Sequence, residues 1–286
     1  MVDVLVVGHL NWDVTLRVDT LPVPDGEAAI VDRDEHAGGS AGNVAVGLAQ
    51  LGVAVGVGGC VGTDDRGEQI VTELRAAGVD TTAIQRDPTR PTTQKYVLVD
   101  PAGEVMVVGA AGANAGFDAA GLPAGWPQGL RWVHLTSQRT AQAQTLAAAA
   151  AAAAVPVSVD PGRRIDTDAA AATADATVVF LNDREAAVAV DVAPTQTRSV
   201  VVKHGPDGAE LRGTAGRTAH PGYPTAATDT TGAGDAFAAG YLAAALRDAP
   251  PERRLAVANA CGAIAAAAAG ARPQLTWAAI ERRLGS

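Results

Sequence analysis

Lysine is scarce in this chain: only Lys95 and Lys203 occur among its 286 residues, and nearly all of the 22 basic residues are Arg. Acidic residues outnumber basic ones, which gives a formal net charge of −9. Because binding to a phosphate backbone requires a basic face, this balance argues against nucleic acid as a partner. The acidic, lysine-poor and alanine-rich composition is typical both of a GC-rich genome and of a salt-adapted cytoplasm, and composition does not separate the two.

Cysteine is equally rare. Cys60 and Cys261 lie in apolar stretches rich in Gly and Ala, which indicates reduced thiols in a core rather than a disulfide. The five histidines are scattered without the spacing of metal ligands. We therefore expect no structural metal.

Long apolar runs are also missing. The alanine tract at 147–154 is bracketed by Gln144 and Pro156 and is too short for a membrane span, so it predicts a helix of a water-soluble domain. The N-terminal stretch lacks the basic segment and cleavage pattern of a signal peptide and predicts a buried strand at 2–8. With no membrane segment expected, the predicted location is the cytoplasm.

The residues that are present alternate between short apolar runs and longer helical stretches, which predicts βαβ units and a mostly parallel sheet covered on both faces. The expected strands are 2–8, 53–60, 95–100, 104–109, 131–136, 155–160, 177–181, 199–203 and 209–212. The expected helices are 42–51, 66–77, 139–154, 183–190, 232–247, 252–270 and 276–284. No internal repeat or long linker interrupts this pattern, so we expect residues 1–286 to form a single domain.

Two segments break the alternation. Residues 13–37 alternate polar and apolar residues around two prolines, and residues 90–109 predict a hairpin with its turn at Pro101–Gly103. We interpret both as a small β-lid over the edge of the sheet where open α/β folds bind ligands. An ordinary surface hairpin is the alternative.

The strongest chemical signal is the string from Asp229 to Phe237, DTTGAGDAF, followed by an alanine-rich helical run. Gly232 and Gly234 remove side chains where a helix begins, so backbone N–H groups and the helix dipole can face an anion. Such a site stabilises charge on a transferring phosphoryl group. Asp235, in the first helical turn, can accept the proton of an attacking hydroxyl; alternatively, it only begins the helix.

Two upstream motifs point to a polyhydroxylated substrate. The pair Gly38–Gly39 permits close approach of backbone to a ligand, and Asn43 can both donate and accept hydrogen bonds to vicinal hydroxyls. The segment from Gly8 to Asp13 follows the first predicted strand. A carboxylate at the carboxyl end of that strand can hold two sugar hydroxyls, although an Asn-x-Asp turn that only caps the strand has the same pattern.

Two further motifs follow later strands. Asn182 and Glu185 form an N-x-x-E pattern after an apolar strand, where Glu185 could equally favour a helix N-terminus. Lys203 and Gly205 open a glycine-rich turn that can wall a nucleotide site. Lys203 can reach ATP phosphates as a point charge or can be a solvated strand-end residue.

Together these motifs resemble the signatures of the ribokinase-like (PfkB) family of sugar and nucleoside kinases. The resemblance runs from Gly8 to Gly270 with the motifs in family order, and the stretch from Val61 to Gly67 also matches. It implies a three-layer α/β/α sandwich with a mostly parallel central sheet and a small β-sheet lid. It further implies ATP and Mg²⁺ as cofactors, K⁺ in some members, and a homodimer formed through the lids.

The resemblance also implies a role for each matching residue. Asp235 would be the catalytic base, with Gly232, Ala233 and Gly234 as the anion hole. The implied substrate-binding residues are Asn11, Asp13, Gly38, Gly39 and Asn43. The implied nucleotide-side residues are Asn182, Glu185, Lys203, Gly205 and Asn259, with Mg²⁺ held by Glu185 through water. Asp229 and Thr231, with the loop from Ala265 to Gly270, match a monovalent-cation site.

Three departures limit the substrate assignment. Lys203 stands where members commonly carry Thr or Ser, Ser40 replaces the Lys that follows the glycine pair in ribokinases and 1-phosphofructokinases, and Ser137 replaces a Glu that ribokinases offer to the sugar. A ketose, an aldose or a keto-deoxy sugar acid all stay open. Nucleoside kinases usually stack the base on aromatic residues, which make up only 3% here, with Trp12 and Tyr96 as the lid candidates.

We therefore expect an ATP-dependent kinase of a small sugar or sugar derivative, with a nucleoside kinase of the same family as the alternative. A non-catalytic sugar- or nucleotide-binding protein would not need an intact Asp235 and Glu185. A dinucleotide-dependent oxidoreductase would need G-x-G-x-x-G after the first strand, whereas Gly8 is followed by His9 and Leu10.

Overall fold

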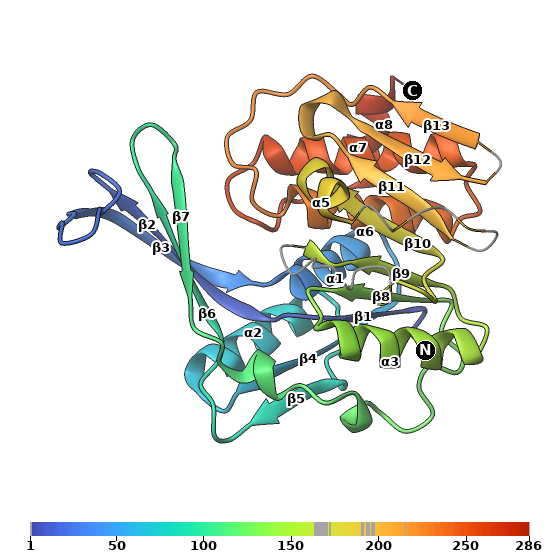
Figure 1. Ribbon diagram of the computed structural model, residues 1–286, viewed down its shortest axis with the longest axis horizontal. Helices are drawn as coiled ribbons and strands as arrows, with labels where there is room; N and C mark the ends of the chain where they lie inside the picture. The colour runs from blue at the N-terminus through green and yellow to red at the C-terminus, as the bar shows by residue number, and fades with distance from the viewer. Residues whose placement is uncertain are drawn as a thin grey trace.

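Short apolar segments of the chain come together in a nine-stranded sheet (Figure 1). In sheet order its strands are β13 (Gly216–His220), β12 (Ala209–Gly213), β11 (Ser199–Lys203), β10 (Val178–Asn182), β9 (Val157–Asp160), β8 (Trp132–Thr136), β1 (Val4–Val7), β4 (Val55–Gly62) and β5 (Ile84–Asp87). In this order, neighbouring strands from β11 to β5 pair in parallel, whereas β12, near one edge, pairs antiparallel with both β11 and β13. The computed structural model describes residues 2–162, 171, 173–189, 192, 195, 198–214 and 216–285.

Helices cover both faces of this sheet, which makes three layers. One face carries α1 (Ser40–Gln50), α2 (Asp65–Ala76), α6 (Ala233–Ala245), α7 (Pro251–Ala266) and α8 (Trp277–Leu284). The other carries α3 (Thr140–Ala152) and α5 (Asp183–Val188). Alternate residues of a strand point to opposite faces, so Val4 and Val6 pack with the first group of helices and Leu5 and Val7 with the second.

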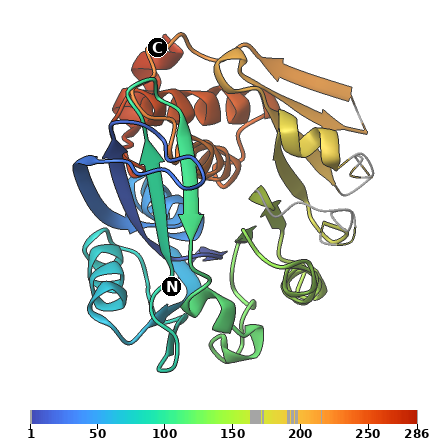
Figure 2. The ribbon, with the colours of Figure 1, turned by 60° about the vertical axis from the view of Figure 1, so that its left-hand side comes forward.

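A second, four-stranded sheet projects from this body, at the left of Figure 1 and toward the viewer in Figure 2. Its strand order is β3 (Ile30–Gly38), β2 (Asn11–Val18), β6 (Gln94–Val99) and β7 (Val105–Gly109). The strands β6 and β7 form the predicted hairpin, with Gly103 in the left-handed region at φ 82°. The two segments that broke the βα alternation thus contribute to one sheet.

The sequence predictions agree with these elements. Each expected strand and each expected helix is present, with ends shifted by a few residues. Two short strands were not predicted: β5 has the mixed sequence IQRD, and β13 is a polar edge strand, GRTAH. Neither has the apolar run or the clear alternation on which strand prediction depends.

One placement differs from the expectation. We expected Asp13 at the carboxyl end of the first strand, but Asn11 and Asp13 lie inside β2. The chain leaves β1 at Val7 and enters the second sheet at Asn11. The two residues therefore sit at the base of the projecting sheet, where it joins the body.

The two cysteines are free and buried, as predicted. Burial raises the pKa of the Cys60 thiol to about 11 and that of Cys261 to about 12. Both thiols are therefore protonated at neutral pH and unreactive. None of the helices among the described residues combines the length and the apolarity needed to cross a bilayer.

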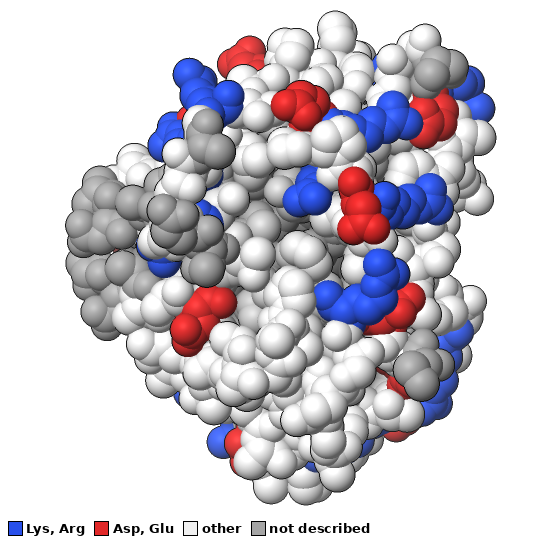
Figure 3. Space-filling view, turned by 90° about the vertical axis from the view of Figure 1, so that its right-hand side faces the viewer, with Lys and Arg blue, Asp and Glu red and all other residues white. Residues whose placement is uncertain are grey.

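Charge on the face shown in Figure 3 is mixed. Lys and Arg side chains there lie beside Asp and Glu side chains, separated by uncharged surface. Among the described residues of this face, the basic side chains are interspersed with acidic ones and form no large basic patch.

Candidate active site

The glycine-rich loop before α6 forms the centre of the site. Gly232, the residue before the helix, has φ 74°, and a Cβ there would lie 2.4 Å from the carbonyl oxygen of Ala271. Only glycine fits this conformation and this contact. A Cβ on Gly234 would lie 3.6 Å from Lys203 Nζ, so the ammonium group lies close to the loop. Loop backbone, helix N-terminus and Lys203 together suit a phosphate group.

Asp235 lies in the first turn of α6 and accepts a hydrogen bond from Asn43 Nδ2 at 2.9 Å. The two residues are 192 positions apart in the chain, so the close packing of α1 against α6 brings them together. Burial raises the pKa of the Asp235 carboxyl to about 7, although the hydrogen bond from Asn43 opposes the rise. A carboxylate with this pKa is a suitable general base near neutral pH.

Arg272 holds Asn43 in place and was not predicted. Its Nε donates to Asn43 Oδ1 at 3.1 Å, and its Nη1 lies 3.3 Å from Glu73 Oε2. Asn43 therefore has its carbonyl toward Arg272 and its amide toward Asp235, which fixes the orientation of the amide group. Burial lowers the pKa of Arg272, opposed by Glu73, but the guanidinium stays charged. In sequence Arg272 belongs to no motif.

Asp13 faces the glycine pair. A Cβ on Gly38 would lie 1.9 Å from Asp13 Oδ2, and Gly39 has φ 88° and donates a backbone hydrogen bond to the same carboxylate. Oδ1 of Asp13 is buried and has no hydrogen-bond partner among the residues that the structure describes. Burial raises the pKa of Asp13, against the lowering effect of His36 and Arg272. An unsatisfied buried carboxylate oxygen is suited to accept a hydrogen bond from a substrate hydroxyl.

Asn11 is held by Asn114, another residue that the sequence did not point to. Asn114 Nδ2 donates to Asn11 Oδ1 at 2.8 Å and to the carbonyl oxygen of Leu10 at 3.1 Å. The backbone N–H of Leu10 in turn donates to Asn114 Oδ1 at 3.1 Å. The turn between β1 and β2 is thereby fixed, and with it the position of Asn11.

Lys203, at the end of β11, is not a solvated strand-end residue. Its Nζ lies 2.6 Å from Asp160 Oδ2, and both side chains are largely buried, with 14% and 12% of their surface exposed. Burial alone would lower the pKa of Lys203, but the attraction of Asp160 raises it above its usual value. Asp160 ends β9 and was missed, because a single Asp after a strand carries no distinctive pattern.

Asn182 and Glu185 form a capping box at the start of α5. Asn182 Oδ1 accepts from the Glu185 N–H and Glu185 Oε2 accepts from the Asn182 N–H, both at 2.9 Å. Burial and the nearby Asp160 raise the pKa of Glu185. The N-x-x-E pattern thus has a local structural role, which also fixes the Glu185 carboxylate beside Asp160 and Lys203.

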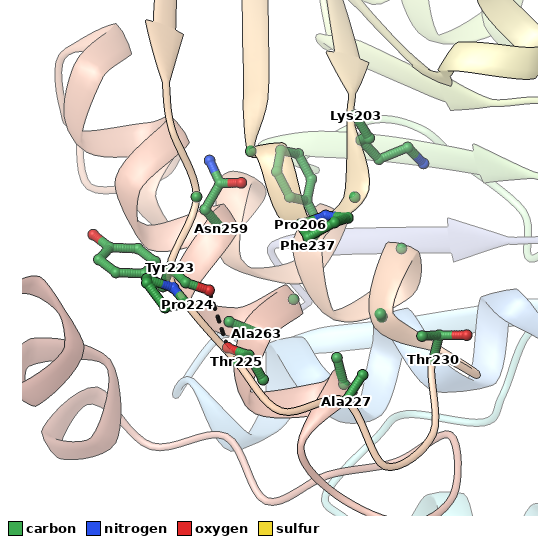
Figure 4. Close-up of a pocket in the computed structure, with 17 residues that line it drawn as sticks. Lys203, Pro206, Tyr223, Pro224, Thr225, Ala227, Thr230, Phe237, Asn259 and Ala263 are labelled. Carbon is green, nitrogen blue, oxygen red and sulfur yellow. Dashed lines mark hydrogen bonds between the residues drawn. The ribbon is translucent and has the colours of Figure 1, made fainter.

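A cavity of about 400 Å³ adjoins the loop, and Thr230, Ala233 and Gly234 belong to its walls. Its walls include Gly205, Asn259, Tyr223 and Lys203. In Figure 4, Tyr223 and Asn259 lie at one end of the cavity, and Lys203 and Thr230 lie at the other. The volume and the mostly apolar walls suit a purine ring, and the end near Lys203 suits phosphates. Asn259 Nδ2 already donates to the Leu255 carbonyl at 2.8 Å.

Asp229 ties two loops together. Its Oδ1 accepts from the Thr231 N–H at 2.8 Å, and its Oδ2 accepts from the Gly270 N–H at 3.1 Å. Burial alone would raise the pKa of Asp229, but these hydrogen bonds outweigh it and lower the pKa. The loop before α6 is therefore braced against the loop after α7.

The structure thus brings the predicted residues into two neighbouring groups. The first group lies at the base of the second sheet and consists of Asn11, Asp13, Gly38, Gly39 and Asn43. The second group lies around β10, β11 and α7 and consists of Asn182, Glu185, Lys203, Gly205 and Asn259. The glycine loop and Asp235 lie between them, since Asp235 contacts Asn43 and interacts electrostatically with Lys203. An anion site with a raised-pKa carboxylate at the meeting point can transfer a phosphoryl group between two bound molecules.

Known proteins share both the sequence and the fold. An ATP-dependent ribose-1-phosphate kinase of Halopiger xanaduensis is 46% identical over 98% of this chain and 97% of its own length. A nucleoside kinase of Methanocaldococcus jannaschii has a similar structure, with a TM-score of 0.89 over 99% of this chain and 98% of its own. A ribokinase of Thermotoga maritima has a TM-score of 0.86 over the full length of both chains. Both structures are 22% identical to this chain and show the fold alone.

The profile described as pfkB family carbohydrate kinase matches residues 1–278. Family match, relative and fold agree with one another and with the motif order in the sequence. The chain therefore belongs to the pfkB family of carbohydrate kinases: it has the ribokinase fold and is an ATP-dependent kinase of a small sugar or sugar derivative.

Proposed function

We propose that this enzyme transfers the γ-phosphoryl group of ATP to a hydroxyl of ribose 1-phosphate, with Asp235 as the general base. The relative from Halopiger xanaduensis supports the substrate, because 46% identity extends over nearly the whole of both chains. The observation that carries the catalytic role is the position of Asp235, which joins the glycine loop to Asn43.

In the proposed reaction the substrate hydroxyl attacks the γ-phosphorus in line with the leaving ADP. A bond forms between the hydroxyl oxygen and phosphorus, and the bond to the β-γ bridging oxygen breaks. Asp235 takes the hydroxyl proton, while Gly232, Ala233 and Gly234 donate backbone hydrogen bonds to the transferring group. The sugar is held by Asp13, Asn11 and the backbone of Gly38 and Gly39. Asn43 orients both the sugar and the catalytic carboxylate of Asp235.

On the nucleotide side we propose that Gly205 and Asn259 border the adenine end of ATP and Lys203 its phosphates. Glu185 and Asp160 offer oxygen ligands of the kind that Mg²⁺ prefers. Among the described residues no three His, Cys, Asp or Glu side chains gather into a metal site, which suits Mg²⁺ held through water and phosphate oxygens. When bound, Mg²⁺ neutralises charge on the β- and γ-phosphates.

A monovalent cation beside Asp229 and Thr231 is a further part of the proposal. The Asp229 carboxylate brings the loop before α6 close to the loop at Gly270. Backbone carbonyls of two such loops, together with one carboxylate, are ligands suited to K⁺. In this position K⁺ would adjust the glycine loop and would take no part in the chemistry.

The substrate proposal is tested by measuring ADP release with a panel of sugars, sugar phosphates, sugar acids and nucleosides, each at low and high KCl. We expect the highest kcat/KM with ribose 1-phosphate, and a rise with KCl if K⁺ supports the loop. A higher kcat/KM with a nucleoside or with an unphosphorylated sugar would overturn the substrate assignment.

The nucleoside alternative requires aromatic surface for a base. Trp12 is only 7% exposed and packs in the core, and its Nε1 donates to Glu35 Oε2 at 2.7 Å. Tyr96 is half-buried and bonds to Gln94. Trp12 is thus occupied in packing, which supports a sugar substrate over a nucleoside.

The pH dependence of the reaction follows from the raised pKa of Asp235. Only the ionised carboxylate can accept the hydroxyl proton, so activity is present above the pKa and is lost as pH falls through it. With a pKa of about 7, we expect kcat/KM for the sugar to rise between about pH 6 and 8 and then level off. A profile that is flat across this interval would contradict the assignment of Asp235 as base.

We also propose that residues 1–286 form one domain in which the second sheet acts as a lid. Two copies of the chain would form a homodimer through this sheet. Among the described residues, seven of the eight exposed large hydrophobic side chains belong to this sheet or its loops: Val23, Ile30, Val31, Val105, Met106, Val107 and Val108. Such a concentration of exposed apolar surface is typical of an interface.

Because ATP is available in the cytoplasm, the cytoplasm stays our prediction for the location of the protein.

Size-exclusion chromatography with light scattering tests the dimer. The wild type should have twice the chain mass of 28.7 kDa, and Val105→Asp/Val107→Asp should have the mass of one chain, because two buried charges oppose association. Val188→Asp, a matched change at a 49% exposed valine outside the sheet, should stay dimeric. A wild type of single-chain mass would refute the dimer.

A further inference from the structure

A second cavity, which we call the side cavity, lies between the base of the second sheet and the start of α3. It has a volume of about 190 Å³. The polar residues of its walls are His9, Thr93, Lys95, Asn114, Arg139 and Gln142. None of the nucleotide-side residues and none of the residues of the glycine loop belongs to these walls.

The side cavity carries positive charge and no carboxylate. Lys95 and Arg139 are its charged residues, with His9, Gln142 and Asn114 as polar neighbours. Lys95 is one of two lysines in a chain of net charge −9, and the other, Lys203, is paired with Asp160. Within the described part of the chain neither Lys95 nor Arg139 has a carboxylate within ion-pair distance. Two cations beside one cavity are suited to an anion.

The backbone keeps the Lys95 ammonium beside this space. A Cβ placed on Gly109, the residue paired with Lys95 across β6 and β7, would lie 2.7 Å from Lys95 Nζ. Lys95 therefore folds over a position with no side chain instead of extending into solvent. Thr93 and Gln142 supply further hydrogen-bonding groups on the walls, and the N-terminal turn of α3 adds its favourable dipole.

The side cavity adjoins two of the residues that we propose to bind the sugar. Asn114 lines it and donates to Asn11 Oδ1 at 2.8 Å. Lys95 is the register partner of Asp13 between β6 and β2, and its charge lowers the pKa of Asp13. A sugar held by Asn11 and Asp13 therefore has Asp235 near one end and the side cavity near the other.

We propose that the side cavity binds the phosphate group that the sugar substrate already carries, with Lys95 and Arg139 as its charged ligands. This inference rests on the proposed function and extends it, because it assigns the residues that select a sugar phosphate over a free sugar. The reacting hydroxyl then lies at the end of the sugar remote from the existing phosphate.

The test compares Lys95→Gln, Arg139→Gln and the conservative Lys95→Arg with the wild type. Calorimetric titration gives the Kd of ribose 1-phosphate in the absence of ATP, and steady-state kinetics give the KM of ATP. Each Gln variant should raise the Kd about 10- to 100-fold, the effect of losing one charged hydrogen-bonding partner. Lys95→Arg should recover most of the affinity, and the KM of ATP should stay within about twofold in all variants.

Arg282→Gln is the matched control, because Arg282 is an exposed arginine on α8 that lines neither cavity. It should leave the Kd unchanged. Thermal unfolding of each variant checks that the fold is intact. An unchanged Kd in both folded Gln variants would refute the side cavity as the phosphate site.

Inorganic phosphate is a second probe that separates the two proposals. If the wild type releases no ADP with ribose 1-phosphate, the proposed function fails, whatever the variants do. The side cavity is then tested alone: inorganic phosphate should bind the wild type and bind the Gln variants at least about 10-fold more weakly. Equal binding of phosphate by wild type and Gln variants would overturn the inference.

Discussion

Replacing Asp235 by Asn should lower kcat about 10²- to 10⁴-fold, because the amide keeps the shape of the carboxylate but cannot accept the hydroxyl proton. The KM of ATP should change little, since the nucleotide cavity is lined by other residues. Steady-state kinetics with ribose 1-phosphate and ATP measure both quantities. A variant that keeps wild-type turnover would remove Asp235 from the role of base.

The same substitution, Asp235→Asn, should lower kcat but raise the stability of the folded protein at pH 8. Burial raises the pKa of Asp235 in the folded protein well above that in the unfolded chain. A carboxyl with a raised pKa costs stability as pH rises through the interval between the two values. Asp235→Asn should therefore be more stable than the wild type at pH 8, and the difference should shrink below pH 4. Chemical denaturation at both pH values checks this sign and shows that lost activity is not lost folding.

The second large effect concerns Lys203. Replacing Lys203 by Met removes the cation that lies 2.6 Å from Asp160 and leaves that carboxylate largely buried without its partner. Breaking one side of a buried ion pair costs about 3–5 kcal/mol, and we expect the free energy of unfolding to fall by this order. The KM of ATP should rise as well, because Lys203 lines the cavity that we propose for the nucleotide, at the end proposed for the phosphates.

A double variant separates these two roles. Lys203→Met/Asp160→Asn removes both charges, so the free energy of unfolding should return most of the way to the wild-type value. The KM of ATP should stay high, because no cation has been restored. Equal instability of the single and double variants in urea denaturation would show that the unpaired Asp160 is not the cause.

The elements that could be predicted from sequence are those whose signal is local. Apolar runs indicated the central strands, and the turn at Pro101–Gly103 indicated the hairpin of β6 and β7. The glycine loop was recognised from the string DTTGAGDAF before a helical run. The structure gives the reason for Gly232, which has a left-handed backbone and lies against Ala271. The order of the motifs then predicted the family to which the chain belongs.

The residues that escaped prediction act across long stretches of chain. Arg272 bonds to Asn43 from 229 positions away, and Asn114 bonds to Asn11 from 103 positions away. Neither has neighbours in sequence that mark its role, and only the packed fold brings the partners together. Asp13 was expected at the end of the first strand but lies in β2. The pattern Asn-x-Asp fits both a turn that follows one strand and the first residues of the next strand, so the sequence did not separate the two.

Lys203 shows how burial decides between two interpretations that a sequence leaves open. The sequence left open whether Lys203 reaches the phosphates of ATP or is a solvated residue at the end of a strand. In the fold, Asp160 from the end of β9 lies beside it, and the Glu185 carboxylate raises its pKa further. The cation is thereby kept charged beside the glycine loop.

The central claim is that the glycine loop and Asp235 direct the γ-phosphoryl group of ATP onto a hydroxyl of a sugar phosphate. ³¹P NMR of the wild type with ATP and ribose 1-phosphate tests it most directly. We predict one new phosphomonoester signal that grows in equal amount with ADP, while the original sugar phosphate signal is converted to that of the bisphosphate. Formation of ADP with inorganic phosphate alone, and no new sugar phosphate signal, would contradict the claim.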